Sequence, residues 1–159
     1  MDKVHYSSKK MDWVTPPEIF DPLQAEFDIG FDVACSSENA RTEFGLYADK
    51  GWDGLNEDWP FWLTCWMNPP YGRVLKAWIQ KAWEEKQHGV TTVCLVPART
   101  DTNWWATFWD HENHRMRDAA DEVRFIKGRI KFMVRHEGEW QRLAPAPFPS
   151  AIVVLRGVV

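Results

Sequence analysis

Two apolar runs with an amphipathic segment between them constrain the fold of this chain more than any other feature. Phe61 to Met67 and Val90 to Val96 have the length of strands, and each run is bounded by proline, asparagine or glycine. Between them, the segment from Arg73 to Gln87 places apolar side chains on one side of a helix, and Gly89 ends it. Strand and helix signals that alternate in this way predict an α/β domain in which helices pack against a sheet.

The rest of the chain supplies further elements. Thr15-Pro16-Pro17-Glu18 is a helix start, with Thr15 as the expected cap and Glu18 at the capping-box position. We expect helices over residues 16–27, 38–44 and 102–111, the last capped by Asp101, and strands over residues 29–34, 122–126, 129–134 and 151–155. Lys127-Gly128 is the expected turn between two of these strands, and residues 135–149 are expected to form a loop. The sheet should be mostly parallel, with an antiparallel C-terminal end.

Length and composition indicate one globular domain. The chain has 159 residues, and two cores would leave each half near the lower limit for independent folding. Hydrophobic residues make up 45% and charged residues 26%. We expect a polar segment over residues 1–12 and a single domain over residues 13–159. No apolar run approaches the ~20 residues of a membrane span, and the polar N-terminus is unlike a secretion signal, so we expect a cytoplasmic protein.

The cysteines and histidines show no spacing that is typical of a metal site. Cys35, Cys65 and Cys94 share no metal-binding spacing and are expected to be reduced core thiols. His111 and His114 lie three residues apart, but no third ligand is spaced to complete a metal site. The eleven tryptophans are expected to lie mostly in the core, with a few facing a flat ligand.

The net charge of −4 argues mildly against a nucleic-acid partner, because affinity for a duplex comes mainly from Lys and Arg at phosphates. Basic side chains nevertheless gather in the second half of the chain. This stretch holds Arg115, Arg117, Arg124, Lys127, Arg129, Lys131, Arg135 and Arg142. A basic face on an acidic protein is therefore one hypothesis for the segment.

Three loops of interest follow predicted strands. They are Asp32-Val33-Ala34-Cys35, Asn68-Pro69-Pro70-Tyr71 and Pro97-Ala98-Arg99-Thr100. Ligand sites in sheets of this kind lie beyond the carboxyl ends of the strands, so we expect these three loops to converge on one site.

The Asn68-Pro69-Pro70-Tyr71 loop has the chemistry to recognise a planar amine. Its two prolines lack N–H groups and restrict the backbone, which stiffens the loop and leaves carbonyl oxygens available. The Asn68 side-chain oxygen and the Pro69 carbonyl form a pair of acceptors for an –NH2 group. Tyr71 adds an aromatic face for stacking a heterocycle. The same four residues would also serve as a rigid turn at the end of a strand, and the position after a buried strand favours the functional interpretation.

From Trp13 to about Leu155, the chain resembles the small phage and prophage DNA N6-adenine methyltransferases of the Dam type. The motifs that carry the resemblance appear in order: Trp13-Val14-Thr15-Pro16, Phe31-Asp32-Val33-Ala34, Asn39-Ala40, Gly54-Leu55-Asn56-Glu57-Asp58-Trp59, Asn68-Pro69-Pro70-Tyr71-Gly72, Leu95-Val96-Pro97-Ala98-Arg99-Thr100, Gly128-Arg129-Ile130-Lys131-Phe132 and Pro147-Phe148-Pro149-Ser150. The resemblance implies a single-domain, Rossmann-like sheet of the class I methyltransferases, with S-adenosylmethionine as cofactor and double-stranded DNA as partner.

The same resemblance assigns roles to individual residues. It implies a catalytic loop of Asn68, Pro69, Pro70 and Tyr71, and a cofactor site that includes Trp13, Thr15, Pro16, Asp32, Ala34, Asn39, Asp58 and Trp59. The pair Asp58-Trp59 is similar to one that binds the cofactor adenine. Arg99, Thr100, Arg129 and Lys131 are the candidate contacts to nucleic acid. One departure concerns the stretch after Asp32, which lacks the glycines usual there.

The expected reaction is methyl transfer to the exocyclic N6 of an adenine flipped out of the duplex. A protein glutamine amide and an RNA base amine are planar amines as well, and they remain alternative substrates. A non-catalytic, Trp-rich module that binds nucleic acid or sugar is the alternative from a different class. GATC is a possible target by resemblance alone, and the chain has little length for a separate recognition domain.

Overall fold

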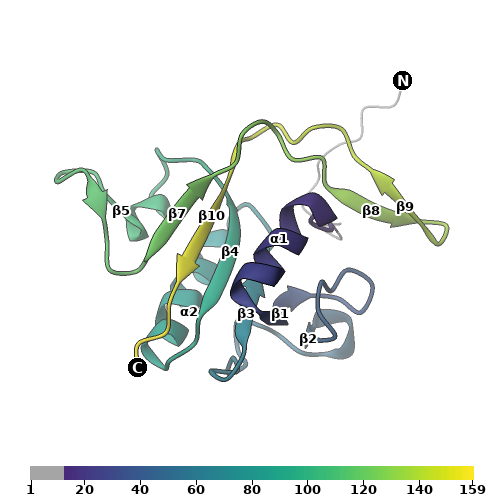
Figure 1. Ribbon diagram of the computed structural model, residues 1–159, viewed down its shortest axis with the longest axis horizontal. Helices are drawn as coiled ribbons and strands as arrows, with labels where there is room; N and C mark the ends of the chain where they lie inside the picture. Colours follow the sequence, from purple (N-terminus) through teal and green to yellow (C-terminus); the bar gives the residue numbers. More distant parts are fainter. Residues whose placement is uncertain (1–12) are drawn as a thin grey trace.

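Six strands form the main sheet of the computed structural model, which describes residues 13–159 (Figure 1). In spatial order the strands are β2 (Phe44–Tyr47), β1 (Ile29–Cys35), β3 (Thr64–Met67), β4 (Thr92–Pro97), β10 (Ser150–Leu155) and β7 (Glu122–Phe125). The first four run parallel, and β10 is antiparallel to both of its neighbours. The predicted α/β class and mostly parallel sheet with an antiparallel C-terminal end are confirmed. The predicted polar segment over residues 1–12 lies outside the described residues.

The strand order reverses at β1. From β1 the chain goes to β2 on one side and then returns to β3 on the other. A sheet leaves a crevice beyond the carboxyl ends of its strands at such a reversal. β10 descends toward the C-terminus in Figure 1, so the parallel strands end at the upper edge of the sheet.

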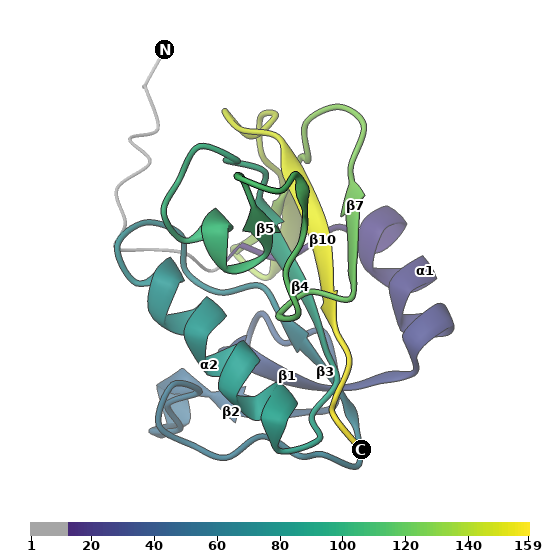
Figure 2. The same cartoon turned by 90° about the vertical axis from the view of Figure 1, so that its left-hand side faces the viewer.

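Two helices cover opposite faces of this sheet (Figure 2): α1 (Pro17–Phe27) and α2 (Leu75–Gln87). Side chains alternate between the two faces, as the pleat of a strand requires. In β3, Trp66 packs with the α1 side, whereas Cys65 and Met67 pack with the α2 side. Strands buried on both faces explain why the apolar runs in the sequence are nearly continuous. No helix between residues 13 and 159 is long and apolar enough to cross a membrane.

The connections between the strands of the sheet contain several short elements. These elements are the 3-10 turns η1 (Ala48–Lys50) and η2 (Trp105–Thr107), the β5 (Trp109–Asp110) and β6 (Arg115–Met116) pair, and the hairpin of β8 (Met133–His136) and β9 (Glu139–Arg142). The β8–β9 turn is Glu137-Gly138, with φ of 51° and 85°. Two successive positive φ values define the type I′ turn that closes a two-residue hairpin.

Two of the predicted helices are wrong, for different reasons. Residues 38–43 form turns and bends and Phe44 begins β2, because Asp32, Asn39 and Thr42 hydrogen-bond to nearby backbone groups. Residues 102–111 form only η2 and then enter β5. Trp105 and Phe108 lie three apart, which aligns both with the core in a 3-10 turn.

The expected strand boundaries also need correction. The run from Phe61 becomes a strand only at Thr64, where pairing with β1 begins, and Phe61 and Trp62 are 66% and 72% exposed. The strand predicted over residues 129–134 lies at Met133–His136, and it pairs with β9 instead of turning back onto β7. The loop predicted over residues 135–149 therefore contains the end of β8, the turn and all of β9.

The expected helix cap at Thr15 is wrong as well. The helix begins one residue later, with Pro16 at the N-cap and no side-chain capping bond. The Glu18 carboxylate pairs with Arg142 of β9. Because the Thr15 hydroxyl does not cap the helix, it is available to another partner and accepts a hydrogen bond from Asn68.

Cysteines and tryptophans are distributed partly as expected. All three cysteines are free and buried, as predicted. Of the eleven tryptophans, four are buried, three are half-buried and four are exposed, so the core accounts for most of them. The exposed four are Trp52, Trp62, Trp83 and Trp140.

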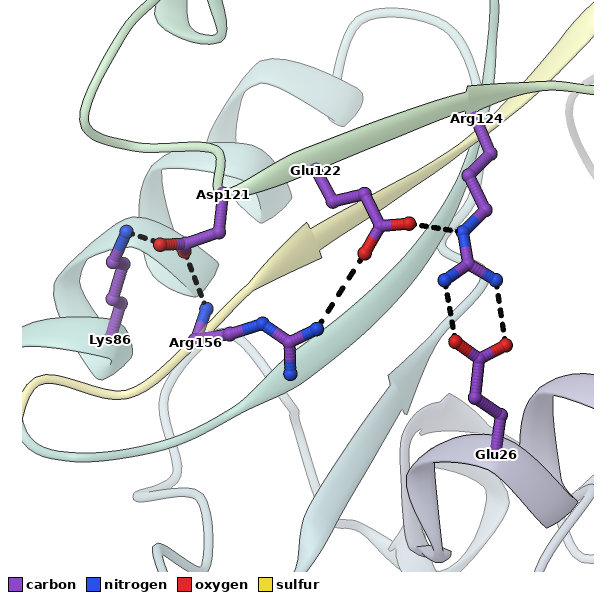
Figure 3. Close-up of polar contacts among 6 residues, drawn as sticks. All are labelled: Glu26, Lys86, Asp121, Glu122, Arg124 and Arg156. Atoms are coloured by element: carbon purple, nitrogen blue, oxygen red, sulfur yellow. Dashed lines mark hydrogen bonds and ion pairs between the residues drawn. The ribbon is translucent and has the colours of Figure 1, made fainter.

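An ion-pair network ties the edge strand β7 to both layers of helices (Figure 3). Arg124 donates two hydrogen bonds to Glu26 of α1, at 2.6 and 2.7 Å, and a further one to Glu122. On the other side of the sheet, Lys86 of α2 donates to Asp121 at 2.7 Å. The paired guanidinium and carboxylate planes hold α1 against β7 with a geometry that a single charge contact lacks.

We expect Arg124→Met to lower the thermal unfolding midpoint by a few degrees at low salt and by less at high salt, because partly exposed ion pairs are screened. Arg115→Met is the matched control, since the Arg115 side chain is 74% exposed and its ion pair with Asp110 is 3.9 Å long. Circular dichroism melts at two salt concentrations measure both variants. Equal shifts for the two variants would contradict a structural role for the network.

Candidate active site

A cavity of about 350 Å³ opens at the carboxyl ends of β1 and β3, where the strand order reverses. The loop after β1, the segment after β2 and the loop after β3 all contribute to its wall. Its lining residues are Val33, Ala34, Cys35, Ser36, Asn39, Leu46, Ala48, Gly51, Trp52, Asp53, Gly54, Asn68, Pro70 and Trp78. Two of the three loops predicted to converge, those after β1 and β3, therefore meet at this cavity, whereas no residue of the third, Pro97-Ala98-Arg99-Thr100, lines it.

Asp32 organises the wall contributed by β1. It is 3% exposed, and its two carboxylate oxygens accept hydrogen bonds from the backbone N–H groups of Ala34, at 3.2 Å, and Arg41, at 3.0 Å. Farther along the loop, the Asn39 side-chain oxygen accepts a hydrogen bond from the backbone N–H of Ser36 at 2.6 Å. Asp32 thus lies beneath the cavity and holds its wall, whereas Ala34 and Asn39 face the cavity directly.

The loop after β1 needs no glycine of its own. Among the described residues, none between Asp32 and Ala40 has a positive φ. The close backbone approach comes instead from Gly54. A Cβ there would collide with the Val33 carbonyl oxygen and come within 2.6 Å of the Trp78 ring. Gly54, on the opposite wall of the cavity, thus allows the close backbone approach for which the loop after β1 has no glycine.

Asn68 is held from two directions at the end of β3. Its side-chain N–H group donates to the Thr15 hydroxyl at 3.2 Å, and its side-chain oxygen accepts from the Tyr71 hydroxyl at 2.9 Å. Thr15 is 1% exposed and lies 53 residues away in the sequence. These two bonds fix the amide plane and leave the second lone pair of its oxygen free to accept another hydrogen.

The Asn68–Tyr71 loop lies between the cavity and a second, aromatic surface. Asn68 and Pro70 line the cavity. Tyr71 packs edge-on against Phe148, with ring centroids 5.4 Å apart and an interplanar angle of 82°. The Arg99 guanidinium lies 5.5 Å from the centre of the Phe148 ring, and burial raises the pKa of Tyr71, which keeps it a neutral hydroxyl.

Other predicted cofactor residues do not line the cavity. Trp13 stacks on Phe132 with ring centroids 5.0 Å apart, and Pro16 is the N-cap of α1. Asp58 and Trp59 lie in a different depression, with Phe61 and His88. Trp59 is 4% exposed, and its indole donates to the Gly54 carbonyl at 2.8 Å. The structure therefore does not bring this pair to the cavity, because Trp59 packs into the core and Asp58 is exposed to solvent.

The predicted nucleic-acid contacts divide in the same way. Arg99 contacts Phe148, which also contacts Tyr71 of the Asn68–Tyr71 loop, whereas Thr100 lines a separate apolar groove with Trp105 and Phe125. Arg129 and Lys131 are exposed on the segment that leads into β8.

Trp52 and Asp53 are site residues that the sequence reasoning missed. Both line the cavity, and Trp52 is 51% exposed. A Trp-Asp pair lies six residues before Asp58-Trp59, so either pair could have matched an acidic and aromatic signature. The cavity-facing pair could have been found from its position beside Gly51 and Gly54, where the backbone can turn and approach closely.

Comparisons with known proteins agree on one family. The model of the DNA N-6-adenine-methyltransferase (Dam) family matches residues 4–157. The DNA N-6-adenine-methyltransferase of Haemophilus phage HP1 (strain HP1c1) is 27% identical over 136 residues, which cover 84% of this chain and 74% of that protein. The DNA N-6-adenine-methyltransferase of Escherichia phage T1 is 31% identical over 99 residues, which cover 58% of this chain and 38% of that protein.

The buried Asp32 predicts a pH dependence of stability. Burial is the main cause that raises its pKa from 3.8 to about 6, so the folded state binds this proton more tightly than the unfolded chain does. The free energy of unfolding therefore falls as the pH rises from about 4 to about 6. Asp32→Asn removes this ionisable carboxyl group. We expect the variant to reduce the pH-dependent fall in the free energy of unfolding by at most about 3 kcal/mol.

Urea unfolding of both proteins at pH values from about 4 to about 7 measures this difference. Asp58→Asn, at an exposed position, is the control and should keep the wild-type profile. Identical profiles for wild type and Asp32→Asn would show that the Asp32 proton does not contribute.

Proposed function

Because the chain belongs to the DNA N-6-adenine-methyltransferase (Dam) family, we propose that it transfers a methyl group from S-adenosylmethionine to the N6 of adenine in double-stranded DNA. The observation that carries the proposal is the position of Asn68, which lines the cavity and is bonded to Tyr71 on its other side. We also propose that residues 13–159 form one methyltransferase domain with a Rossmann-like sheet, on the basis of the strand reversal at β1.

The cavity fits S-adenosylmethionine in size and chemistry. Its volume of about 350 Å³ lies within the usual range for small-molecule sites. Small residues such as Ala34, Ser36 and Gly51 leave room along the walls, and Gly54 lets two backbone segments meet closely behind them. Trp52 offers a flat face for the adenine ring. The Asp53 carboxylate and the Asn39 amide offer polar groups for ribose hydroxyls and the ammonium group.

When bound, the cofactor supplies a methyl group already activated on a sulfonium. The chain therefore needs to position the accepting amine, and positioning is worth up to ~7–11 kcal/mol in well-oriented reactions. Asn68 and Pro70, which line the cavity and belong to the same stiff loop, are the residues proposed to set that position.

Two oxygens of the loop, on the Asn68 side chain and the Pro69 backbone, are placed to accept hydrogen bonds from the substrate amine. The Asn68 side-chain oxygen keeps one lone pair beside the bond from Tyr71, and within residues 13–159 no donor bonds to the Pro69 carbonyl. Both oxygens accepting from one –NH2 group would pull its nitrogen toward tetrahedral geometry and free its lone pair. An amide oxygen is too weak a base to keep the proton, so the proton leaves to water after the transfer.

Tyr71 is proposed to stack on the adenine once that base has left the duplex. The hydroxyl bond to Asn68 and the edge contact with Phe148 keep the ring from rotating away. Arg99, over the outer part of Phe148, would place a positive charge near the DNA backbone beside this base.

We expect Asn68→Ala to lower kcat for methyl transfer by ~10²–10³-fold or more, as the loss of one oriented acceptor or donor does in other enzymes. Binding of S-adenosylmethionine, followed by calorimetry, should change little. Labelled cofactor with DNA, RNA or protein as acceptor measures the transfer, and mass spectrometry of digested DNA identifies N6-methyladenine. Label entering only RNA or protein would overturn the proposed substrate, and full turnover by the variant would remove Asn68 from the mechanism.

The cofactor site has a separate test with a matched control. Trp52→Ala should weaken S-adenosylmethionine binding by about tenfold or more, because it removes a stacking face worth ~1–2 kcal/mol. Trp62→Ala removes a more exposed tryptophan outside the cavity and should bind the cofactor normally. Calorimetric titration of both variants decides the point. Normal binding by Trp52→Ala would place the cofactor adenine elsewhere.

A further inference from the structure

The β8–β9 hairpin projects from the body of the molecule (Figure 1). Its base is anchored in the core by Ile130 and Phe132, which are 4% and 1% exposed. Between the hairpin and the body, the two sides of the arm stay paired by backbone hydrogen bonds. The Ala146 N–H donates to the Ile130 carbonyl, and the Leu143 N–H donates to the Phe132 carbonyl. Residues 127–146 therefore form an arm, with Ile130 and Phe132 buried at its base and an exposed tip from Arg135 to Arg142.

The arm differs in charge from the rest of the chain. Residues 127–142 hold five Lys and Arg against two Glu, which leaves a charge of +3 in a chain of net charge −4. The remainder of the chain therefore carries −7. Within residues 13–159, Arg142 is the member of this group that forms an ion pair, with Glu18. Lys127, Arg129, Lys131 and Arg135 are exposed and have no carboxylate partner in that range.

The tip carries an aromatic ring beside one of these charges. Arg135 and Trp140 are cross-strand partners on one face of the hairpin, and the guanidinium lies 5.9 Å from the centre of the indole ring. Trp140 is 46% exposed. A guanidinium that is stacked and free of carboxylates is preorganised to contact a phosphate or a base edge.

The arm is also connected to the catalytic residues. Val14 and Met133 exchange backbone hydrogen bonds of 2.8 and 2.9 Å at the base of the hairpin. The next residue, Thr15, accepts the bond from Asn68. One short segment thus sets the position of both the arm and the catalytic amide.

We propose that the arm is a DNA-binding element, with the tip of the β8–β9 hairpin lying in the major groove of the duplex beside the target adenine. The inference rests on the proposed function and adds the surface that holds the duplex. A two-stranded ribbon fits the major groove, which is about 12 Å wide. Its excess positive charge complements the phosphates, whereas the rest of the chain would repel them.

The test compares Arg135→Ala, the double variant Arg135→Ala/Trp140→Ala, and Arg156→Ala as control. Arg156→Ala loses the same charge at the opposite end of the sheet, where the chain ends in Figure 1. Fluorescence anisotropy with a labelled duplex that contains adenine gives Kd at several salt concentrations, in the presence of S-adenosylhomocysteine. Circular dichroism checks that every variant is folded.

We expect the double variant to bind the duplex about tenfold more weakly or worse, which is 1.4 kcal/mol or more. The slope of log Kd against log salt should fall by about 0.9 for each phosphate contact removed. Arg156→Ala should keep the wild-type slope. In steady-state methylation, the arm variants should raise KM for DNA while kcat changes little.

Failure of this inference and failure of the proposed function give different results. A wild-type protein that neither binds the duplex nor methylates it would overturn the proposed function. A wild-type protein that does both, with arm variants that bind and methylate equally well, would overturn the arm alone. Arm variants that change the oligomeric state in ultracentrifugation but keep the DNA affinity would also overturn it, because the hairpin would then serve contact between copies of the chain.

Discussion

Strands β3, β4 and β10 bury side chains on both faces, and this two-sided burial is the constraint on which the rest of the structure depends. A sheet of this kind must be covered on each face, which α1 and α2 do from opposite sides (Figure 2). Once both faces are covered, the ends of the strands are the places where functional side chains can meet a ligand. The cavity at the reversal between β1 and β3 follows from this arrangement.

The site combines stiffness in the loop with support from distant parts of the chain. Prolines 69 and 70 limit the backbone locally, but the orientation of the Asn68 amide depends on Thr15, 53 residues earlier. The cavity wall likewise depends on a buried carboxylate, Asp32, that holds two backbone N–H groups. Burial raises the pKa of Asp32 to about 6, so its ionised form lowers the free energy of unfolding at neutral pH. The carboxylate that holds the cavity wall therefore destabilises the fold.

Charge is distributed between stability and binding. In the body of the molecule, arginines such as Arg124 and Arg156 are paired with carboxylates, which removes them from any extended basic face (Figure 3). Within the basic stretch seen in the sequence, Arg124 braces the edge strand. On the arm, Lys127, Arg129, Lys131 and Arg135 are exposed and pair with no carboxylate of residues 13–159.

The amino-acid sequence was sufficient to predict the α/β class, the mostly parallel sheet and the meeting of the loops after β1 and β3, because the order of apolar residues reports two-sided burial and helical periodicity. It also located the candidate loop at Asn68, since prolines after a strand act locally. Packing between distant segments places Trp52 and Asp53 at the cavity in place of Asp58 and Trp59. It also decided that Thr15 supports Asn68 instead of capping a helix, and that residues 133–142 form a hairpin. These outcomes depend on contacts between segments far apart in the chain, which local patterns cannot report.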